Sequence, residues 1–597
     1  MAEQNTDQGL SGQKAQPTAP GPKIVPPEQS KSAWDNGATG TIATRKGQYL
    51  IGSRPLPGLA PIPADLVVQR LSEMDGVEIV RRLRSRGSEG SMGEGTELPP
   101  EIVVVRMDER RSDELRRSAA PNLVIECDGL LHLAEATLPG PSVSRSWEAV
   151  MSLPSRGREV LFRIVGDSDR PLMGASVFVF GLGVASQALT DASGKATVTF
   201  YGEHNDAARG LDAVRAVYVR PAAGHWDCFI PDPALGDDAN LVRLRPLSET
   251  FPNFPNQRLL GWGQRLMKLD LVADSLDAAG VKIGLVVSGC DHTHPLLRHV
   301  TQGVEIVDPA RPSGWTIDPT GHGTHSAGII AASDRSQAQG ILGFAPGAEL
   351  HVLKVFPGGR FSDLIAALDE CIERQLDVVN IGVCGDQASG LVALKFAEAR
   401  QKEVACIVAA GGSGGQGALS AVRPGALAVS AVGKLGEFPP DTYHAQMAVA
   451  LSVGAEGLFT PRFSKDTPPG GVSAPGVAIV STVPDGGYSA RDGNSVAAAH
   501  ITGLAAILLA HHPLFQGPYR TRGQDRTAAL FETIRASSEL TQMGALSGLQ
   551  QLPGWAAPTS QAGRDAFARS LGLPRGSSVP AYLANPVLMQ LRAMGMI

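Results

Sequence analysis

The second half of the chain alternates short apolar runs with amphipathic segments. The runs are Ile283–Val287, Leu350–Val355, Asp377–Ile381, Val404–Ala409 and Ala426–Ala431. Runs that lack polar alternation are typical of parallel strands buried on both faces. With helices between them, they predict an α/β domain with a doubly wound parallel sheet over residues 257–555.

One segment of this domain illustrates the predicted helices. Its apolar residues recur at helical spacing, at Leu364, Ile365, Leu368, Cys371 and Ile372. This periodicity predicts a helix with a single buried stripe. Ser362 precedes the stripe and is placed to cap the N-terminus of the helix.

The first part of the chain reads differently. Residues 1–43 have few large apolar side chains, which predicts a disordered tail. Residues 44–137 follow the order strand, helix, strand, strand, helix, strand, which predicts a small α+β domain. Its expected elements are Gln48–Ile51, Ala64–Met74, Val77–Leu83, Ile102–Arg106, Asp108–Arg117 and Leu123–Glu126.

Residues 158–248 contain short strands separated by Gly, Asp and Pro turns, which predicts a small β-sandwich. The run Arg170–Ala175, followed by Thr190–Gly194, resembles the transthyretin-like or carboxypeptidase-regulatory modules. Residues 556–597 are loop-rich and form a C-terminal extension.

Composition narrows the class of protein. The chain has 597 residues, 43% of them hydrophobic, which suits several packed domains and excludes a disordered chain. The formal net charge of −6 gives no reason to expect a nucleic-acid partner.

The sequence gives no sign of secretion or membrane insertion. The N-terminus lacks a basic region followed by an apolar core, and the most apolar segment, Ile501–Ala510, is about half the length of a membrane span. The six cysteines lack paired spacing, which favours free thiols. We therefore expect a cytoplasmic protein with no membrane partner.

Two distant motifs carry the candidate chemistry. They are Gly321-His322-Gly323-Thr324-His325-Ser326-Ala327-Gly328 and Asp492-Gly493-Asn494-Ser495-Val496-Ala497-Ala498-Ala499-His500. In order, spacing and context they resemble the motifs of the subtilases, the subtilisin-like serine peptidases. The resemblance implies that His322 is the base and Ser495 the nucleophile. It also implies that residues 44–137, by layout and position, form a propeptide-like domain.

The third motif of that family departs from the pattern. The strand Val281–Asp291 carries Val287 where the resemblance calls for the triad aspartate. Gly412 stands where the family has the oxyanion-hole asparagine. The substrate-lining run reads Asn380-Ile381-Gly382-Val383-Cys384, so a side chain at Cys384 replaces a glycine that lets a peptide backbone approach. Gly382, Val383 and Cys384 are the expected substrate-binding residues. Asn494, Val496 and Ala499 replace the Thr, Met and Pro that flank the family's serine.

These departures bear on catalysis. A serine hydroxyl needs a neighbouring imidazole to take its proton, and the imidazole needs an acid on its other nitrogen. Val287 cannot supply that acid. Asp291, four residues after Val287, and Asp318, four before His322, are the candidate substitutes.

No cofactor or metal is expected from the residues. His322 with His325, or His292 with His294, could suggest zinc ligands, but no motif places a third ligand. Calcium is implied only by the family resemblance. Cys384 is interpreted as an inert small residue rather than a reactive thiol.

Three functional hypotheses follow. In the first, the chain is a pseudoenzyme or strongly impaired protease that binds a peptide or protein in its cleft and keeps its propeptide-like domain attached. In the second, it is an active serine endopeptidase with a substitute acid. In the third, it is a non-catalytic assembly scaffold.

Overall fold

The protein is described here from a computed structural model. It describes residues 46–83, 101–135, 157–181, 185–200, 211, 214–334, 339–385, 387–411, 425–449, 453–454, 456–464, 470–523, 525–542 and 549–553. Residues 539–542 and 549–553 are described by their backbone alone. The predicted tail over residues 1–43 and the predicted extension over residues 556–597 lie outside the described residues.

An eight-stranded sheet forms the centre of the peptidase-like domain. Its strand order is β14-β15-β13-β16-β18-β19-β20, with β21 paired to β19, and all neighbours except β19 and β20 are parallel. The strands are β13 (Lys282–Val287), β14 (Gln302–Glu305), β15 (Glu349–Lys354), β16 (Val378–Ile381), β18 (Ala405–Ala409), β19 (Ala426–Lys434), β20 (Leu458–Phe459) and β21 (Val472–Pro475). The predicted doubly wound arrangement of this domain is confirmed.

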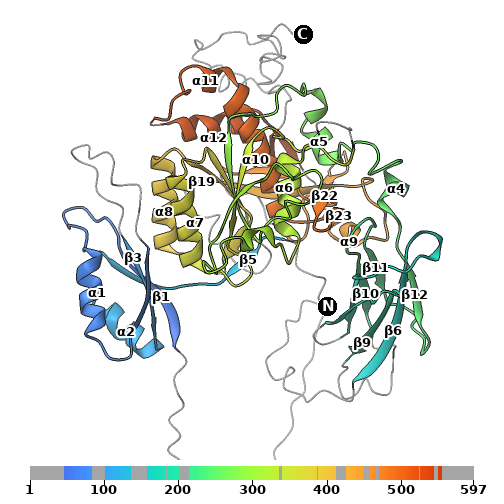
Figure 1. The fold of residues 1–597 in the computed structure, drawn as a ribbon, viewed down its shortest axis with the longest axis horizontal. Helices are drawn as coiled ribbons and strands as arrows, with labels where there is room; N and C mark the ends of the chain where they lie inside the picture. The colour runs from blue at the N-terminus through green and yellow to red at the C-terminus, as the bar shows by residue number, and fades with distance from the viewer. Residues whose placement is uncertain are drawn as a thin grey trace, which may run out of the picture. The chain divides into compact units, whose positions relative to one another are not determined.

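Helices cover both faces of this sheet. Strand residues alternate between two buried clusters, so that Leu285 and Val287 of β13 pack with α10 while Val286 packs with α7 and α8. Figure 1 shows α7 (Phe361–Glu373) and α8 (Gly390–Gln401) together on one side of the sheet. Helices α6 (His322–Ala331) and α10 (Asn494–His511) contact each other and the other side.

Helix α10 is the longest and most apolar helix of the described residues. By length and composition it could cross a membrane, but 89% of its apolar window is buried inside the protein. It is therefore the core helix of this domain, contacting β16, β18, β19 and β21. Its first residues carry the second motif.

Helix α7 tests the prediction made from its sequence. The predicted stripe of Leu364, Ile365, Leu368, Cys371 and Ile372 is buried, as expected. The predicted cap is wrong, because Ser362 is the second residue of the helix rather than its N-cap. Asp363 accepts the N–H of Arg360, and Asp128 accepts the N–H of Ser362 at 2.9 Å.

The N-terminal domain packs on α7 and α8. Its sheet has the order β2-β3-β1-β4. Glu126 accepts the N–H groups of Gly390 and Leu391 at the start of α8, just as Asp128 does at the start of α7. Carboxylates are stabilised at helix N-termini, so two acids of one domain fix it on two helices of another. Its elements are β1 (Gly47–Ser53), α1 (Ala64–Ser72), β2 (Glu78–Leu83), β3 (Ile102–Met107), α2 (Glu109–Ser118) and β4 (Leu123–Cys127).

The middle domain has two sheets, β11-β10-β7-β8 and β12-β6-β9, which share one buried cluster. Alternate apolar residues of its strands fill that cluster, as expected for strands with one buried face. The strands are β6 (Arg158–Val165), β7 (Ser176–Phe180), β8 (Ser186–Leu189), β9 (Lys195–Phe200), β10 (Ala216–Arg220), β11 (Cys228–Pro231) and β12 (Asn240–Arg243).

The remaining elements connect or cover these units. They are β5 (Leu131–Leu133), α4 (Leu247–Thr250), α5 (Trp262–Leu266), β17 (Val383–Gly385), α9 (Tyr443–Gln446), β22 (Ile479–Val483), β23 (Gly487–Arg491), α11 (Pro513–Gln516), α12 (Arg526–Ala536), β24 (Ser538–Gln542) and β25 (Leu549–Pro553), with single 3₁₀ turns at Asp167–Asp169, Leu269–Leu271 and Gly314–Thr316.

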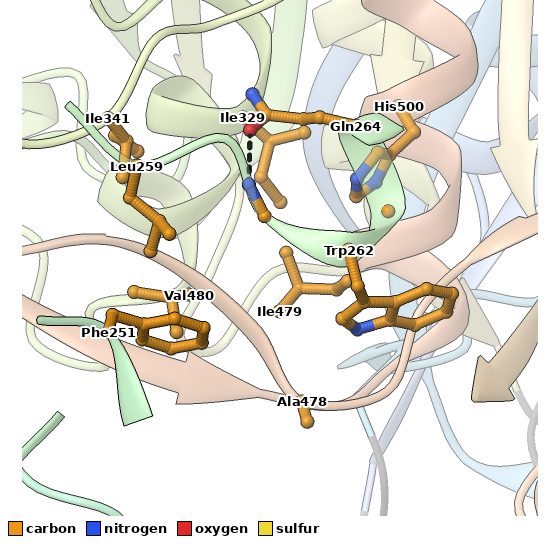
Figure 2. A pocket seen from close by; sticks show the side chains of 12 residues that line it. Phe251, Leu259, Trp262, Gln264, Ile329, Ile341, Ala478, Ile479, Val480 and His500 are labelled. Carbon is orange, nitrogen blue, oxygen red and sulfur yellow. Dashed lines mark hydrogen bonds between the residues drawn. The ribbon is translucent and has the colours of Figure 1, made fainter. Parts of the chain in front are cut away.

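Helix α5 anchors the connection into the peptidase-like domain. The indole of Trp262 donates to Val477 O at 3.0 Å. Gln264 accepts the N–H of Gly261 at 2.9 Å, the dashed line in Figure 2. The hollow beside them, bordered by Ile479 and His500, holds only about 20 Å³. That volume suits a single water, so the hollow serves packing rather than ligand binding.

A buried charge cluster joins the middle domain to the serine-bearing loop. His444 Nδ1 lies 2.7 Å from Asp492 Oδ1, and its Nε2 lies 3.8 Å from Asp227 Oδ2 of the middle domain. Burial alone would lower the pKa of His444, but the two carboxylates raise it to about 9. The ring is therefore charged at neutral pH, and it stabilises two buried acids at once.

This cluster predicts a fall in stability at alkaline pH. Because the folded pKa of His444 is about 9 and its ordinary value is 6.5, its contribution is complete below about pH 6.5 and is lost as the pH rises through 9. We expect the free energy of unfolding to fall by about 3 kcal/mol over that range in urea titrations of the whole chain. Asp227→Asn removes one carboxylate and should move the fall to lower pH. The exposed Asp441→Asn serves as control, and identical pH profiles for both variants would contradict this account.

Candidate active site

His322 is positioned by a polar loop at the start of α6. Gly321 precedes it with φ of +71°, a conformation that glycine adopts at low cost. Asp318 accepts the N–H of Gly321 at 2.9 Å and the N–H of Thr324 at 2.8 Å, and the hydroxyl of Ser288 donates to it at 2.8 Å. The carboxylate of Asp318 therefore caps the first turn of α6 and holds the imidazole in place.

Ser495 is the second residue of α10, and Asn494 fixes that helix start. Asn494 accepts the N–H of Ala431 at 2.8 Å and donates to Ala410 O at 2.9 Å, which ties α10 to the middle of β19 and to the residue that follows β18. The Asn that replaces the family Thr is thus a structural bridge. Ser495 Oγ lies 2.8 Å from His322 Nε2, so the structure brings the two predicted residues into direct contact.

The other ring nitrogen, His322 Nδ1, is buried and has no hydrogen-bond partner among the described residues. Val287, fully buried at the end of β13, lies beside the ring. Gly382 shows how close these side chains are to one another. If it carried a Cβ atom, that atom would lie 2.8 Å from His322 Cε1, 3.3 Å from Val287 Cγ1 and 3.6 Å from Ser495 Cβ, so the three side chains pack around Gly382. An aliphatic group therefore occupies the side of the imidazole where an acid would act.

Neither candidate substitute acid bonds to the ring. Asp318 is occupied in capping α6, as described above. Asp291 accepts the N–H and hydroxyl of Thr293 and the N–H of Asp485. Asp318 therefore serves the start of a helix, and Asp291 serves the loop after β13.

The surroundings keep His322 neutral. Burial lowers the pKa of His322, and the guanidinium of Arg491 lowers it further, while the carboxylates of Glu135 and Asp318 oppose this. A neutral ring can accept the serine proton. Once charged, however, it gains no direct hydrogen bond to an acid at Nδ1.

A short strand that was not predicted as part of the site pairs with the expected substrate-binding residues. Strand β5 (Leu131–Leu133) pairs antiparallel with β17 (Val383–Gly385). Leu131 N–H donates to Gly359 O at 2.9 Å and Ala134 N–H to Gly382 O at 3.1 Å. Val383 and Cys384 therefore form a wall that pairs with an extended chain through its backbone. The alternation Leu131-His132-Leu133 was the sequence signal for such a strand.

The Ala134 carbonyl is directed at the nucleophile. Ser495 N–H donates to Ala134 O at 3.1 Å. A Cβ atom on Gly493 would lie 2.9 Å from Ala134 O and 3.0 Å from both Glu135 Cα and Ser495 Oγ. The peptide bond between Ala134 and Glu135 thus occupies the place of a bond under attack, with one main-chain donor on its carbonyl. Gly412, the expected site of the missing second donor, lies outside the described residues.

Two of the four histidines considered as zinc ligands bond to backbone carbonyls instead. His325 Nε2 lies 2.9 Å from Ile479 O, and His294 Nε2 lies 3.1 Å from Gly487 O. In the part of the chain that the structure describes, no three His, Cys, Asp or Glu side chains converge as a metal site requires. None of the six cysteines forms a disulfide: Cys290, Cys371 and Cys406 are buried, Cys228 and Cys384 half-buried, and Cys127 exposed.

These features define a class of protein. A serine and a histidine at the starts of two helices, at one edge of a doubly wound sheet, face the carbonyl of a bound extended strand. This is the site of a serine peptidase fold.

Comparison with known proteins names the family. The profile of the subtilase family matches residues 278–546. The chain is 34% identical over 243 residues to Subtilisin NAT of Bacillus subtilis subsp. natto, which is 39% of this chain and 57% of that protein. It is 33% identical over 240 residues to Subtilisin of Bacillus pumilus (39% and 78%) and 32% identical over 260 residues to Subtilisin DY of Bacillus licheniformis (42% and 85%). The chain belongs to the subtilase family.

The match has a limited extent. The chain spans little more than half the length of Subtilisin NAT and Subtilisin E, at 57% of each. The N-terminal and middle domains lie outside the matched segment of the family profile.

The bridging role of Asn494 predicts a large effect on stability. Asn494→Ala leaves the buried Ala410 O without its side-chain partner and leaves the Ala431 N–H with Ser464 Oγ alone, and we expect a loss of about 1–3 kcal/mol in the free energy of unfolding. Urea denaturation of the whole chain measures this loss. The exposed Asn256→Ala is the matched control and should stay within about 0.5 kcal/mol of the parent. Equal midpoints for the two variants would refute the bridge.

Proposed function

We propose that this subtilase hydrolyses peptide bonds very slowly or not at all, and that its cleft works in recognition of extended peptides or proteins. The observation that carries the proposal is the environment of His322. Its Nδ1 is buried beside Val287 with no acidic partner in the described ranges. Proton transfer from Ser495 then creates a buried imidazolium that lacks its usual stabilisation.

The expected loss of rate is large. In subtilisin, removal of the triad aspartate lowers kcat by about 3 × 10⁴, and removal of the oxyanion-hole asparagine lowers it by about 10² to 10³. If the two losses multiplied, the activation barrier would rise by roughly 9 to 10 kcal/mol, which is an upper bound because such effects are not additive. Val287 and Gly412 stand at these two positions.

The N-terminal domain is the first ligand of the cleft in this proposal. We infer that it acts as a propeptide that stays attached, because it supplies β5 and places the Ala134 carbonyl against Ser495 N–H. The middle domain acts as an accessory module. Six cysteines without paired spacing are compatible with a reducing compartment such as the cytoplasm.

One observation favours a second candidate, a slow but active serine endopeptidase. The hydroxyl of Ser495 lies 2.8 Å from His322 Nε2 and close to the Ala134–Glu135 bond, so nucleophile, base and one oxyanion donor are all in position. Such an enzyme would cut its own chain between these two residues. The hypothesis of a non-catalytic scaffold is less well supported, because it does not explain why β5 pairs with β17 beside Ser495.

Intact-mass measurement of the purified chain separates the two candidates. We expect full-length protein after prolonged incubation, because the activation barrier for hydrolysis of the Ala134–Glu135 bond stays high without the triad acid and the amide donor. Self-cleavage at that bond, abolished by Ser495→Ala, would refute the proposal. Labelling of Ser495 by a fluorophosphonate is a second measurement, and we expect it to be at least about 10³-fold slower than for an active subtilase.

Restoration of the missing groups provides the converse test. Val287→Asp with Gly412→Asn should return the acid and the amide donor, and we expect release of a fragment that ends at Ala134. Val287→Asn with Gly412→Asn has the same shape at residue 287 but no charge, and it should remain intact. Cleavage by both double variants would show that the acid is not the missing component.

A further inference from the structure

The residue that follows the Ala134 carbonyl has a dedicated partner. Glu135 forms an antiparallel bridge with Gly493, which places its side chain on the leaving-group side of the cleft. Arg491 Nη1 donates to Glu135 Oε1 at 2.9 Å. Only 17% of the Arg491 side chain and 22% of the Glu135 side chain are exposed. Because the Arg491–Glu135 ion pair is largely buried, dissolved salt weakens its attraction less than it weakens a surface ion pair.

Arg491 is held in place from both sides of the active site. It is the last residue of β23, two residues before Gly493 of the serine loop. Its Nη2 donates to Thr320 O at 2.9 Å, two residues before His322. A Cβ atom on Gly321 would approach Arg491 Nη2 to 2.7 Å, so the glycine leaves room for the guanidinium. The cation is therefore built into the cleft and does not depend on the bound strand for its position.

The local charges favour an anionic occupant. Burial would raise the pKa of Glu135, but the guanidinium of Arg491 and that of Arg220 in the middle domain help to lower it below its ordinary value. Without an acid beside it, the Arg491 guanidinium would be left partly buried beside the His322 ring, and a partly buried unpaired charge is costly. A neutral or basic side chain in place of Glu135 therefore forms no ion pair with Arg491, and the cost of the partly buried, unpaired guanidinium remains.

We propose that the leaving-group side of the cleft selects peptides with an acidic residue directly after a small residue, and that Arg491 is the specificity-determining residue. The occupant seen in the structure, Leu131-His132-Leu133-Ala134-Glu135, defines the ligand class: an extended peptide with apolar residues before the small residue and a carboxylate after it. The inference rests on the proposed role of the cleft in peptide binding. It does not depend on whether hydrolysis occurs.

Hydrogen exchange in the whole chain tests the proposal. In the parent protein, the amides of Leu131 and Ala134 should be protected because they donate to Gly359 and Gly382. Glu135→Gln and Arg491→Gln should each speed exchange of residues 131–135 by about tenfold, the value for loss of one partly shielded ion pair. The exchanged pair Glu135→Arg with Arg491→Glu should regain at least half of the lost protection. The exposed Glu73→Gln, on the same domain, is the control and should leave the segment unchanged.

A competition experiment then tests selectivity for external peptides. In the full-length Glu135→Gln variant, the acetylated peptide Leu-His-Leu-Ala-Glu-amide should bind about tenfold more tightly than its Gln counterpart and more tightly still than its Lys counterpart, measured by fluorescence anisotropy. In Glu135→Gln combined with Arg491→Gln, the Glu and Gln peptides should bind alike.

The outcomes distinguish the two proposals. If residues 131–135 are protected equally in all variants and the three peptides bind equally, acid selection by Arg491 is wrong, while the peptide-binding cleft stands. If the segment is unprotected in the parent protein, the cleft does not hold the strand and both proposals fail.

Discussion

The site depends on two helix starts that are fixed by buried polar side chains. Asp318 accepts hydrogen bonds from the first turn of α6, and Asn494 bridges the start of α10 to the end of β18 and the middle of β19. Both helices therefore begin at the same edge of the parallel sheet, where open α/β folds bind their ligands. Their first residues place His322 and Ser495 within 2.8 Å of each other. Loss of Asp318 or Asn494 would therefore separate His322 from Ser495, whether or not the site is catalytic.

These anchors explain how the site keeps its geometry without its acid. The contacts that position His322 run through the backbone of α6 and through Ser495, and they do not involve Nδ1. The buried Nδ1 costs about 1–3 kcal/mol of unmet hydrogen bonding, which the packing of two buried helices can offset. Burial also lowers the pKa of His322, so the ring avoids the greater cost of an unpaired charge. The fold thus tolerates Val287, whereas the transition state for hydrolysis does not.

The sequence predicted those parts of the protein that local pattern determines. Short motifs and periodicity predicted the strands around β13, the buried stripe of α7 and the meeting of His322 with Ser495. Features made by distant partners were not predicted. The cap of α7 comes from Asp128, 234 residues earlier, rather than from Ser362. The Arg491–Glu135 pair joins residues 356 positions apart. Neither partner carries a local signal, because hydrogen bonding between domains leaves no periodicity in either segment.

The attachment of the bound strand limits what else can enter the cleft. Leu131 follows Asp128 by three residues, and Asp128 is itself fixed on α7, so the strand is presented to the cleft at an effective concentration of about millimolar or higher. An external peptide with the same contacts must exceed that concentration to displace it. Recognition of a partner therefore requires the N-terminal domain to leave α7 and α8, or requires the partner to make contacts beyond residues 131–135. Because both caps of the N-terminal domain, Glu126 and Asp128, are carboxylates bonded to helix N-termini, a partner that supplies carboxylates to α7 and α8 has the chemistry needed to release it.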